Sequence, residues 1–264
     1  MAASVTPALV HSKTLVRWFT RYSRRYVRKH FHSVRVLKSH SLSAGFADLP
    51  VAVFANHASW WDPLIFLLLT EKHFPARAAF GPMDADALRR YKFLSKLGFF
   101  PVERNDARDA VAFLRTAAEV LASPARILWL TPQGQFADVR ARPVSIQRGL
   151  AHLAARVAPA VFLPLAIEYT FWEERSPEIL LAWGPPIFTA NHRDGCGVDD
   201  WTIAIEMALQ ETQEALAVAA QQRRSEEWEK LFHGRTGTTR AYDSWRWIRA
   251  RVTGQTFSKR HSDL

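Results

Sequence analysis

The sequence lacks a second cysteine and a long apolar run, and each absence limits what the chain can be. Cys196, the only cysteine among 264 residues, cannot form an internal disulfide and supplies neither a zinc ribbon nor a CxxC redox site. With no secretion-type start, we expect a reducing cytosolic compartment. The longest apolar run covers residues 63–69, far short of the roughly 20 residues that span a bilayer, so we expect no such helix.

The composition is that of a folded globular protein. Hydrophobic residues make up 48% and charged residues 23% of the chain, which excludes global disorder and fibrous repeats. The ten histidines show no spacing typical of metal ligands, so we expect no metal site.

The formal net charge of +10 is concentrated at the two ends of the chain. Residues 1–38 carry +9 without a single acidic residue, the last 25 residues carry +4, and the part between them sums to −3. We therefore divide the chain into a basic N-terminal segment (1–40), a body (41–235) and a basic, aromatic C-terminal tail (236–264).

Residues 13–30 predict a basic amphipathic helix with an aromatic face. One side holds Leu15, Trp18, Phe19, Tyr22 and Tyr26, and the opposite side holds Arg17, Arg21, Arg24 and Arg28. Such a helix is typical of an anionic membrane surface, where its rings enter the acyl region and its guanidinium groups contact phosphates. Two other interpretations stay open: the aromatic face packs on the body, or the helix binds nucleic acid.

Strands and helices are expected to alternate along the body. Short apolar runs predict strands, and longer amphipathic runs predict helices. The expected strands cover residues 50–55, 78–81, 99–102, 126–130, 161–169 and 178–183, and the expected helices cover residues 62–72, 85–97, 107–122, 146–157 and 199–232. This alternation predicts an α/β fold with a single mixed, mostly parallel sheet flanked by helices and preceded by the N-terminal basic amphipathic helix.

The loop after the first strand of the body contains a candidate catalytic pair. His57 precedes Asp62 by five residues, and Asp62 with Pro63 is expected to begin the next helix, with Asp62 as its N-cap. A carboxylate in this place could hold one ring nitrogen of the imidazole and raise the basicity of the other, as a general base requires. Each residue alone also has an ordinary interpretation, Asp62 as a helix cap and His57 as a loop histidine.

Four blocks of sequence, in order, resemble the motifs of the glycerolipid acyltransferase family typified by 1-acyl-glycerol-3-phosphate acyltransferases. Residues 56–63 resemble its first motif, Asn-His-x4-Asp; residues 98–104 resemble the second; residues 130–134 stand in the place of the third; and residues 161–167 resemble the fourth, an apolar strand with a central proline. The resemblance covers about residues 50–170 and implies that the body, 41–235, is an acyltransferase domain.

The resemblance implies a mechanism and a set of site residues. His57 would take the proton from an acceptor hydroxyl that attacks an acyl thioester, and Asp62 would orient His57. Backbone N–H groups near Gly134 or after His57 could stabilise the oxyanion. The residues assigned to substrate binding are Asn56, Arg104, Gln133, Gly134, Arg140 and Arg142, of which Arg104 stands where the family's arginine helps to hold the acceptor phosphate. No cofactor is expected, only acyl-CoA or acyl carrier protein as co-substrate.

The third motif departs from the family's usual Phe-Pro-Glu-Gly-Thr-Arg. Gln133 replaces the glutamate, and residues 135–138 contain no arginine, although Arg140 and Arg142 follow and could swing into the site. This weakens the case for a phosphomonoester acceptor, because a dianion favours bidentate guanidinium contacts. Gln133 and Gly134 could also form a simple turn after a strand.

These observations predict a peripheral enzyme at the cytoplasmic face of the cell membrane that acylates a lysoglycerophospholipid. Its expected partners are an anionic membrane surface, the lysolipid acceptor and the acyl donor, without nucleic acid. Two alternatives stay open. The acceptor could be another lipid hydroxyl, such as that of a glycosyl carotenoid or an ornithine lipid, or the chain could be a non-catalytic basic protein that binds membrane or nucleic acid.

Overall fold

The computed structural model describes residues 9–42, 46, 48–103, 107–172, 174–191 and 196–234. The strands are β1 (Ser33–Leu37), β2 (Val51–Ala55), β3 (Ala78–Asp84), β4 (Phe99–Val102), β5 (Arg126–Leu130), β6 (Val161–Thr170), β7 (Glu178–Trp183), β8 (Ile187–Phe188) and β9 (Trp228–His233). The α-helices are α1 (Lys13–His30), α2 (Asp62–His73), α3 (Ala85–Arg90), α4 (Ala107–Leu121), α5 (Gly149–Ala154) and α6 (Val198–Gln222), and the short 3-10 helices are η1 (Lys38–His40), η2 (Lys92–Leu97), η3 (Thr189–Asn191) and η4 (Ser225–Glu227).

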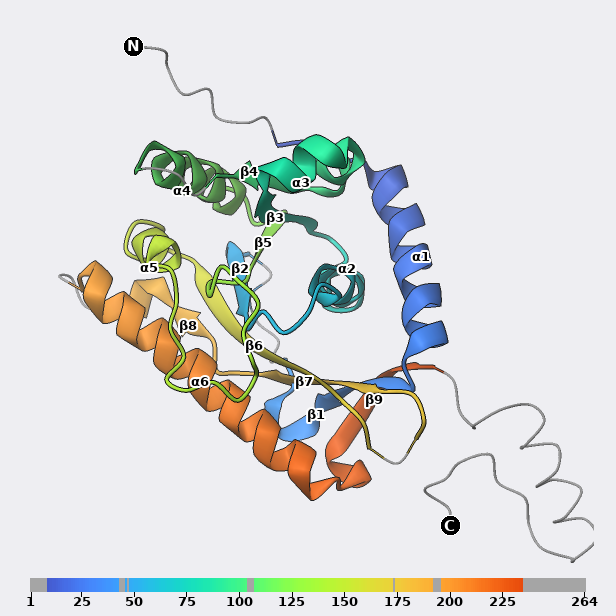
Figure 1. Cartoon of the computed structure of the whole chain (residues 1–264). Coiled ribbons are helices and arrows are strands. Elements are labelled where there is room, and N and C mark those ends of the chain that lie inside the picture. Colours follow the sequence, from blue (N-terminus) through green and yellow to red (C-terminus); the bar gives the residue numbers. More distant parts are fainter. Residues whose placement is uncertain are drawn as a thin grey trace, which may run out of the picture.

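One mixed sheet organises these elements. In the described residues its strand order is β4-β3-β5-β2-β6-β7-β1-β9, with β8 paired to β6 (Figure 1). The strands β4, β3, β5, β2 and β6 run parallel to one another, and β7 is parallel to β1; the antiparallel pairs are β6 with β7, β6 with β8 and β1 with β9. The predicted α/β class with a mixed, mostly parallel sheet is therefore confirmed. Because β2, β5 and β6 run in one direction, their carboxyl ends meet at the same edge of the sheet.

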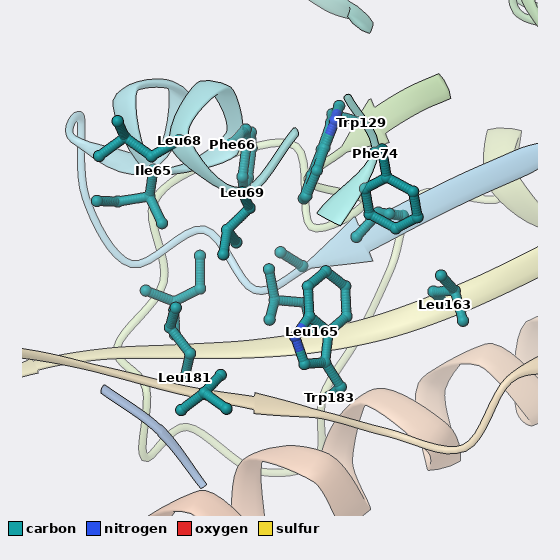
Figure 2. Packing of buried hydrophobic residues seen from close by; sticks show 14 of the residues in the cluster. Ile65, Phe66, Leu68, Leu69, Phe74, Trp129, Leu163, Leu165, Leu181 and Trp183 are labelled. Carbon is teal, nitrogen blue, oxygen red and sulfur yellow. The ribbon is translucent and has the colours of Figure 1, made fainter. Parts of the chain in front are cut away.

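Helices cover both faces of the sheet. On one face, α2 packs its apolar side chains on the central strands, and Figure 2 shows Phe66 beside Trp129, whose rings stack with centroids 4.7 Å apart. The Trp129 indole N–H also donates a 3.0 Å hydrogen bond to Oγ1 of Thr70 in α2. On the other face lie α4, α5 and α6 (Figure 1). Since the central strands are buried on both faces, they read as continuous apolar runs in the sequence.

The helix α1 has the bounds that its amphipathic pattern predicts, Lys13–His30. Ser12 caps it by accepting a hydrogen bond from the backbone N–H of Leu15. It lies beside α2 (Figure 1) and buries Thr20, Ser23 and Val27. These three residues are spaced on a face of their own, distinct from both the aromatic face and the arginine face.

The helix expected over residues 85–97 is broken in two at Tyr91, whose φ of −119° and ψ of 66° are not helical. The break lets η2 follow its own direction, which buries Leu97 and brings the ring of Phe93 to 6.1 Å from that of Phe19 in α1. Gly98 then ends η2 with φ 100°, in a place where a Cβ would lie 2.1 Å from a backbone oxygen. Tertiary contacts therefore override the local helical pattern.

The helix expected over residues 146–157 is shorter, Gly149–Ala154, and the backbone N–H groups of two residues before it bond to other segments. The N–H of Ile146 donates to Oε1 of Glu206, and that of Gln147 donates to the carbonyl of Pro132. These bonds tie the segment to α6 and to the loop after β5 instead.

The helix expected to reach residue 232 ends at Gln222. Arg223 adopts a left-handed conformation with φ 53°, and the strand β9 follows and pairs with β1. The strand β1 was also not expected, since residues 33–37 fall in the basic segment 1–40. The strand β1 pairs with β7 and β9, and β9 pairs with β1; local pattern does not reveal these distant partners.

None of the helices in the described part of the chain is long and apolar enough to span a bilayer. The predicted C-terminal tail, 236–264, lies outside the described residues.

Candidate active site

His57 and Asp62 form a hydrogen-bonded pair at the carboxyl edge of the sheet. The strand β2 ends at Ala55, the chain passes through a short loop, and α2 begins at Asp62. Nδ1 of His57 lies 2.8 Å from Oδ2 of Asp62. The Asp62 side chain is fully buried, whereas that of His57 is 22% exposed. This is the arrangement of a general base, in which one ring nitrogen is held by a carboxylate and the other is left for a substrate proton.

Three groups donate hydrogen bonds to the Asp62 carboxylate. Oδ2 accepts from His57 and from the backbone N–H of Ser59 at 3.1 Å, and Oδ1 accepts from the Tyr169 hydroxyl at 2.7 Å. The predicted role of Asp62 as N-cap is wrong: the cap position is Trp61, and Asp62 lies in the first turn with its carboxylate aimed at His57. Burial, and then the Asp62 charge, raise the pKa of Tyr169 well above its ordinary value, so its phenol stays a donor.

Asn56 fixes the strand that carries the pair. Its side-chain Nδ2 donates to the carbonyl of Ile167 at 2.9 Å, and its Oδ1 accepts from the N–H of the same residue at 2.8 Å. Asn56 is buried, and it does not line the cavity described below. Its amide therefore anchors the end of β2 to β6, which positions His57 rather than a substrate.

The segment after β5, residues 131–138, contacts His57 at its backbone and at its ring. Oε1 of Gln133 accepts a 2.8 Å hydrogen bond from the His57 backbone N–H, and the Ala137 N–H donates to the His57 carbonyl at 3.0 Å. The ring of Phe136 lies against the imidazole with centroids 4.3 Å apart. The segment is therefore more than a simple turn, since its residues fix the backbone of His57 and cover one side of its ring.

Gly134 provides the tight turn but not a free donor. Its φ of 73° is a conformation that favours glycine, and the residue lines the cavity beside His57. Its N–H, however, donates to the carbonyl of Thr131 at 3.0 Å. The oxyanion donors expected near Gly134 or after His57 therefore do not include this N–H.

An apolar cavity of about 590 Å³ extends from His57 into the protein. Its wall includes Phe66 and Leu67 of α2, Phe80 of β3, Phe113 of α4 and Leu150 of α5. The His57–Asp62 pair thus lies between solvent and a cavity that suits a long apolar group. Among the described residues, no group of three or more His, Cys, Asp or Glu side chains could hold a metal ion.

The sequence profile of the acyltransferase family, described as "Acyltransferase", matches residues 27–168, which is more than half of the chain and includes the His57–Asp62 pair. The chain belongs to the acyltransferase family. No curated protein matches its sequence.

The fold of this acyltransferase is similar to the crystal structure of the 1-acyl-sn-glycerophosphate (LPA) acyltransferase PlsC from Thermotoga maritima. The TM-score is 0.55 at 14% sequence identity, and the match covers 78% of this chain and 80% of the other. At this identity the likeness shows a shared fold.

The arginines assigned to substrate binding do not enter the cavity of His57. Arg140 forms a bidentate pair with Asp138, and Arg142 lies 3.5 Å from Glu214 and donates to two backbone carbonyls. Both line a second, polar cavity of the acyltransferase instead. The expectation that they swing toward His57 is therefore wrong for this structure, because acidic partners hold them elsewhere. Arg104 lies outside the described residues.

Two residues of the acyltransferase site were missed in the sequence. Tyr169 is 107 positions from Asp62, and only the parallel pairing of β2 and β6 brings its strand beside the loop between β2 and α2. Phe136 occurs within residues 135–138, the run in which the family's usual arginine is absent. The absence of the arginine can be seen in the sequence, but the contact between the Phe136 ring and His57 cannot.

Proposed function

We propose that this acyltransferase moves a fatty acyl group from a thioester, carried by coenzyme A or an acyl carrier protein, to the hydroxyl of a lysoglycerophospholipid. The observation that carries the proposal is the His57–Asp62 pair, 2.8 Å apart, at the mouth of an apolar cavity. The name of the Thermotoga maritima neighbour, a lysophosphatidate (LPA) acyltransferase, supports the choice of acceptor.

The proton transfers follow from the geometry of the pair. Nδ1 of His57 donates to Asp62, so Nε2 accepts the proton of the acceptor hydroxyl as its oxygen attacks the thioester carbonyl. Asp62 stabilises the imidazolium that forms. When the tetrahedral intermediate collapses, the C–S bond breaks and the imidazolium protonates the leaving thiolate. No covalent acyl-enzyme is needed, and His57 returns to its starting state.

The apolar cavity provides the place for the acyl chain. Its wall is formed by α2, β3, β4, α4, β5 and α5, and most of the side chains that line it are apolar. Burial of a long acyl chain is favourable by roughly 0.8 kcal/mol per CH₂ group, which gives the enzyme affinity for long-chain donors. The carbonyl carbon would then lie near the open end, beside His57.

An acceptor and donor panel tests this proposal. The purified full chain is incubated with palmitoyl-CoA or palmitoyl acyl carrier protein and with lysophosphatidate, other lysophospholipids, a glycosyl carotenoid and an ornithine lipid. Esterification of a lysophospholipid supports the proposal. Transfer only to one of the last two lipids overturns the acceptor, and transfer to none overturns the activity.

An exposed aromatic surface gives the enzyme a means to reach lipid substrates. It consists of Trp18, Phe19, Tyr22, Tyr26, Trp60 and Phe93. The rings of Trp18 and Trp60 are both 59% exposed, although Trp60 belongs to the loop between His57 and Asp62. Phe19 and Tyr26 contact rings of the body, but Trp18, Tyr22, Trp60 and Phe93 stay exposed, so packing of α1 on the body does not account for the whole surface.

We propose that the aromatic surface and the arginines of α1 dock the enzyme as a peripheral protein on the anionic, cytoplasmic face of the cell membrane. Trp and Tyr are favoured at the level of the lipid headgroups, and each basic residue near such a surface adds about 1 kcal/mol. Since Trp60 is part of the catalytic loop, docking would bring the loop to the leaflet that holds the acceptor.

A further inference from the structure

A second cavity, of about 930 Å³, lies on the α6 side of the catalytic loop and has a polar wall. It is lined by Ala58, which follows His57, and by Tyr169, which bonds Asp62. The catalytic loop is therefore flanked by an apolar cavity on one side and a polar cavity on the other. Since the apolar cavity is assigned to the acyl chain of the donor, the polar cavity is the place left for a polar headgroup of the acceptor.

Charges of both signs line the polar cavity, and four of the six charged groups are paired. Arg140 is held by Asp138, and Arg142 faces Glu214. The two that remain are Arg223, whose Nη2 lies 3.5 Å from the carbonyl of Phe171, and Glu168. The cavity therefore offers a ligand one cation and one anion that are not already in an ion pair.

Glu168 is the group in this wall that lacks a donor. It lies on β6 between the two residues that contact Asn56 and Asp62, and alternation along the strand turns it to the α6 face. Within the part of the chain that the structure describes, no side chain donates a hydrogen bond to its carboxylate. Burial raises the pKa of Glu168, and the positive charge of Arg140 offsets this only in part, which reflects the cost of keeping an ionised carboxyl group there without a hydrogen-bond donor. A ligand that carries an ammonium group would supply that partner.

We propose that the polar cavity binds a zwitterionic, amine-bearing phosphodiester headgroup of the acceptor lipid, with Glu168 receiving the ammonium group and Arg223 contacting the phosphodiester. This inference rests on the proposed function and specifies its substrate. A phosphomonoester fits the cavity less well, since two of its three arginines are already paired with carboxylates.

The test compares two phosphodiester acceptors, one with an amine in its headgroup and one with hydroxyl groups instead. Lysophosphatidylethanolamine and lysophosphatidylglycerol of the same chain length are presented in neutral detergent micelles, and kcat/KM is measured for each. The wild-type enzyme should favour the ethanolamine lipid, and Glu168→Gln should lower this preference about tenfold, the usual scale for loss of one charge-assisted contact. Glu211→Gln, an exposed change on α6 outside the cavity, should keep the wild-type preference.

Binding of the soluble headgroups separates this inference from the reaction. Glycerophosphoethanolamine and glycerophosphoglycerol are titrated into the full chain and followed by saturation-transfer NMR. Tighter binding of the ethanolamine compound, lost in Glu168→Gln, supports the headgroup site even if no acyl transfer is detected, which would overturn the proposed function alone. Equal binding of both compounds, an unchanged preference in Glu168→Gln, or an effect only on the KM of the acyl thioester overturns the headgroup site.

Discussion

The hydroxyl of Tyr169 donates a 2.7 Å hydrogen bond to Oδ1 of Asp62, the oxygen that His57 does not use. The two side chains come from β6 and from the start of α2; Asp62 is fully buried and Tyr169 is partly buried. The carboxylate thus has a donor on each oxygen and a fixed plane. We interpret Tyr169 as a positioning residue, because it acts on His57 only through Asp62.

Tyr169→Phe should lower kcat about tenfold and reduce the free energy of unfolding by about 1–3 kcal/mol, because one oxygen of a buried carboxylate loses its donor. Steady-state kinetics and urea unfolding measure the two effects. Tyr22→Phe removes a hydroxyl from an exposed ring and serves as the matched control. A Tyr169→Phe enzyme with unchanged kcat would show that Asp62 is held well enough by its other donors.

Gln133 is expected to act through the backbone of His57. Gln133→Ala removes the acceptor of the His57 N–H and should lower kcat/KM about tenfold, the scale of one lost hydrogen bond at a reacting group. Gln133→Glu keeps an acceptor oxygen and should retain more activity than the alanine variant. Equal losses in both variants would contradict this role and would indicate that the amide contacts a substrate.

The sequence alone predicted much of the fold and the core of the site. The bounds of α1 follow from a helical repeat of apolar and basic residues, and the His57–Asp62 pair follows from a spacing that a single strand-to-helix loop can close. Both signals are local, so one stretch of chain contains all that is needed to recognise them.

What could not be predicted depends on contacts between distant segments. The strand β9 lies at the edge of the sheet and pairs with β1, nearly 200 positions away, and neither strand has a distinctive pattern by itself. The early end of α6 at Arg223 has no glycine or proline to mark it. Whether Arg140 and Arg142 turn toward His57 was left open by the sequence, because their carboxylate partners in the fold are not visible in it.

The aromatic surface should control binding to vesicles. The double variant Trp18→Ala, Tyr22→Ala removes two exposed rings and should lower the partition coefficient onto phosphatidylglycerol vesicles about tenfold. Flotation assays measure this, with Phe171→Ala, another exposed ring outside the aromatic surface, as the control. Equal recovery of the wild-type chain with anionic and neutral vesicles would contradict the electrostatic part of the docking proposal.

Glu168 should make stability depend on pH. Burial raises its pKa above the ordinary 4.5, so the wild-type protein loses stability from this group as the pH rises through the raised pKa. Glu168→Gln cannot ionise and should have a higher Tm than wild type at pH 7, with a smaller difference at pH 4. Thermal unfolding at both pH values measures this, with Glu211→Gln as control. A Tm difference that is the same at pH 4 and pH 7 would contradict ionisation as its cause.

The central claim is that His57 is the general base of acyl transfer, and the most direct measurement is the transfer rate of His57→Ala. General base catalysis contributes about 10²- to 10⁴-fold, so kcat should fall by at least about 100-fold. Circular dichroism and thermal unfolding should show that the variant stays folded, since the imidazole is partly exposed. A folded His57→Ala enzyme that transfers acyl groups at the wild-type rate would contradict the account.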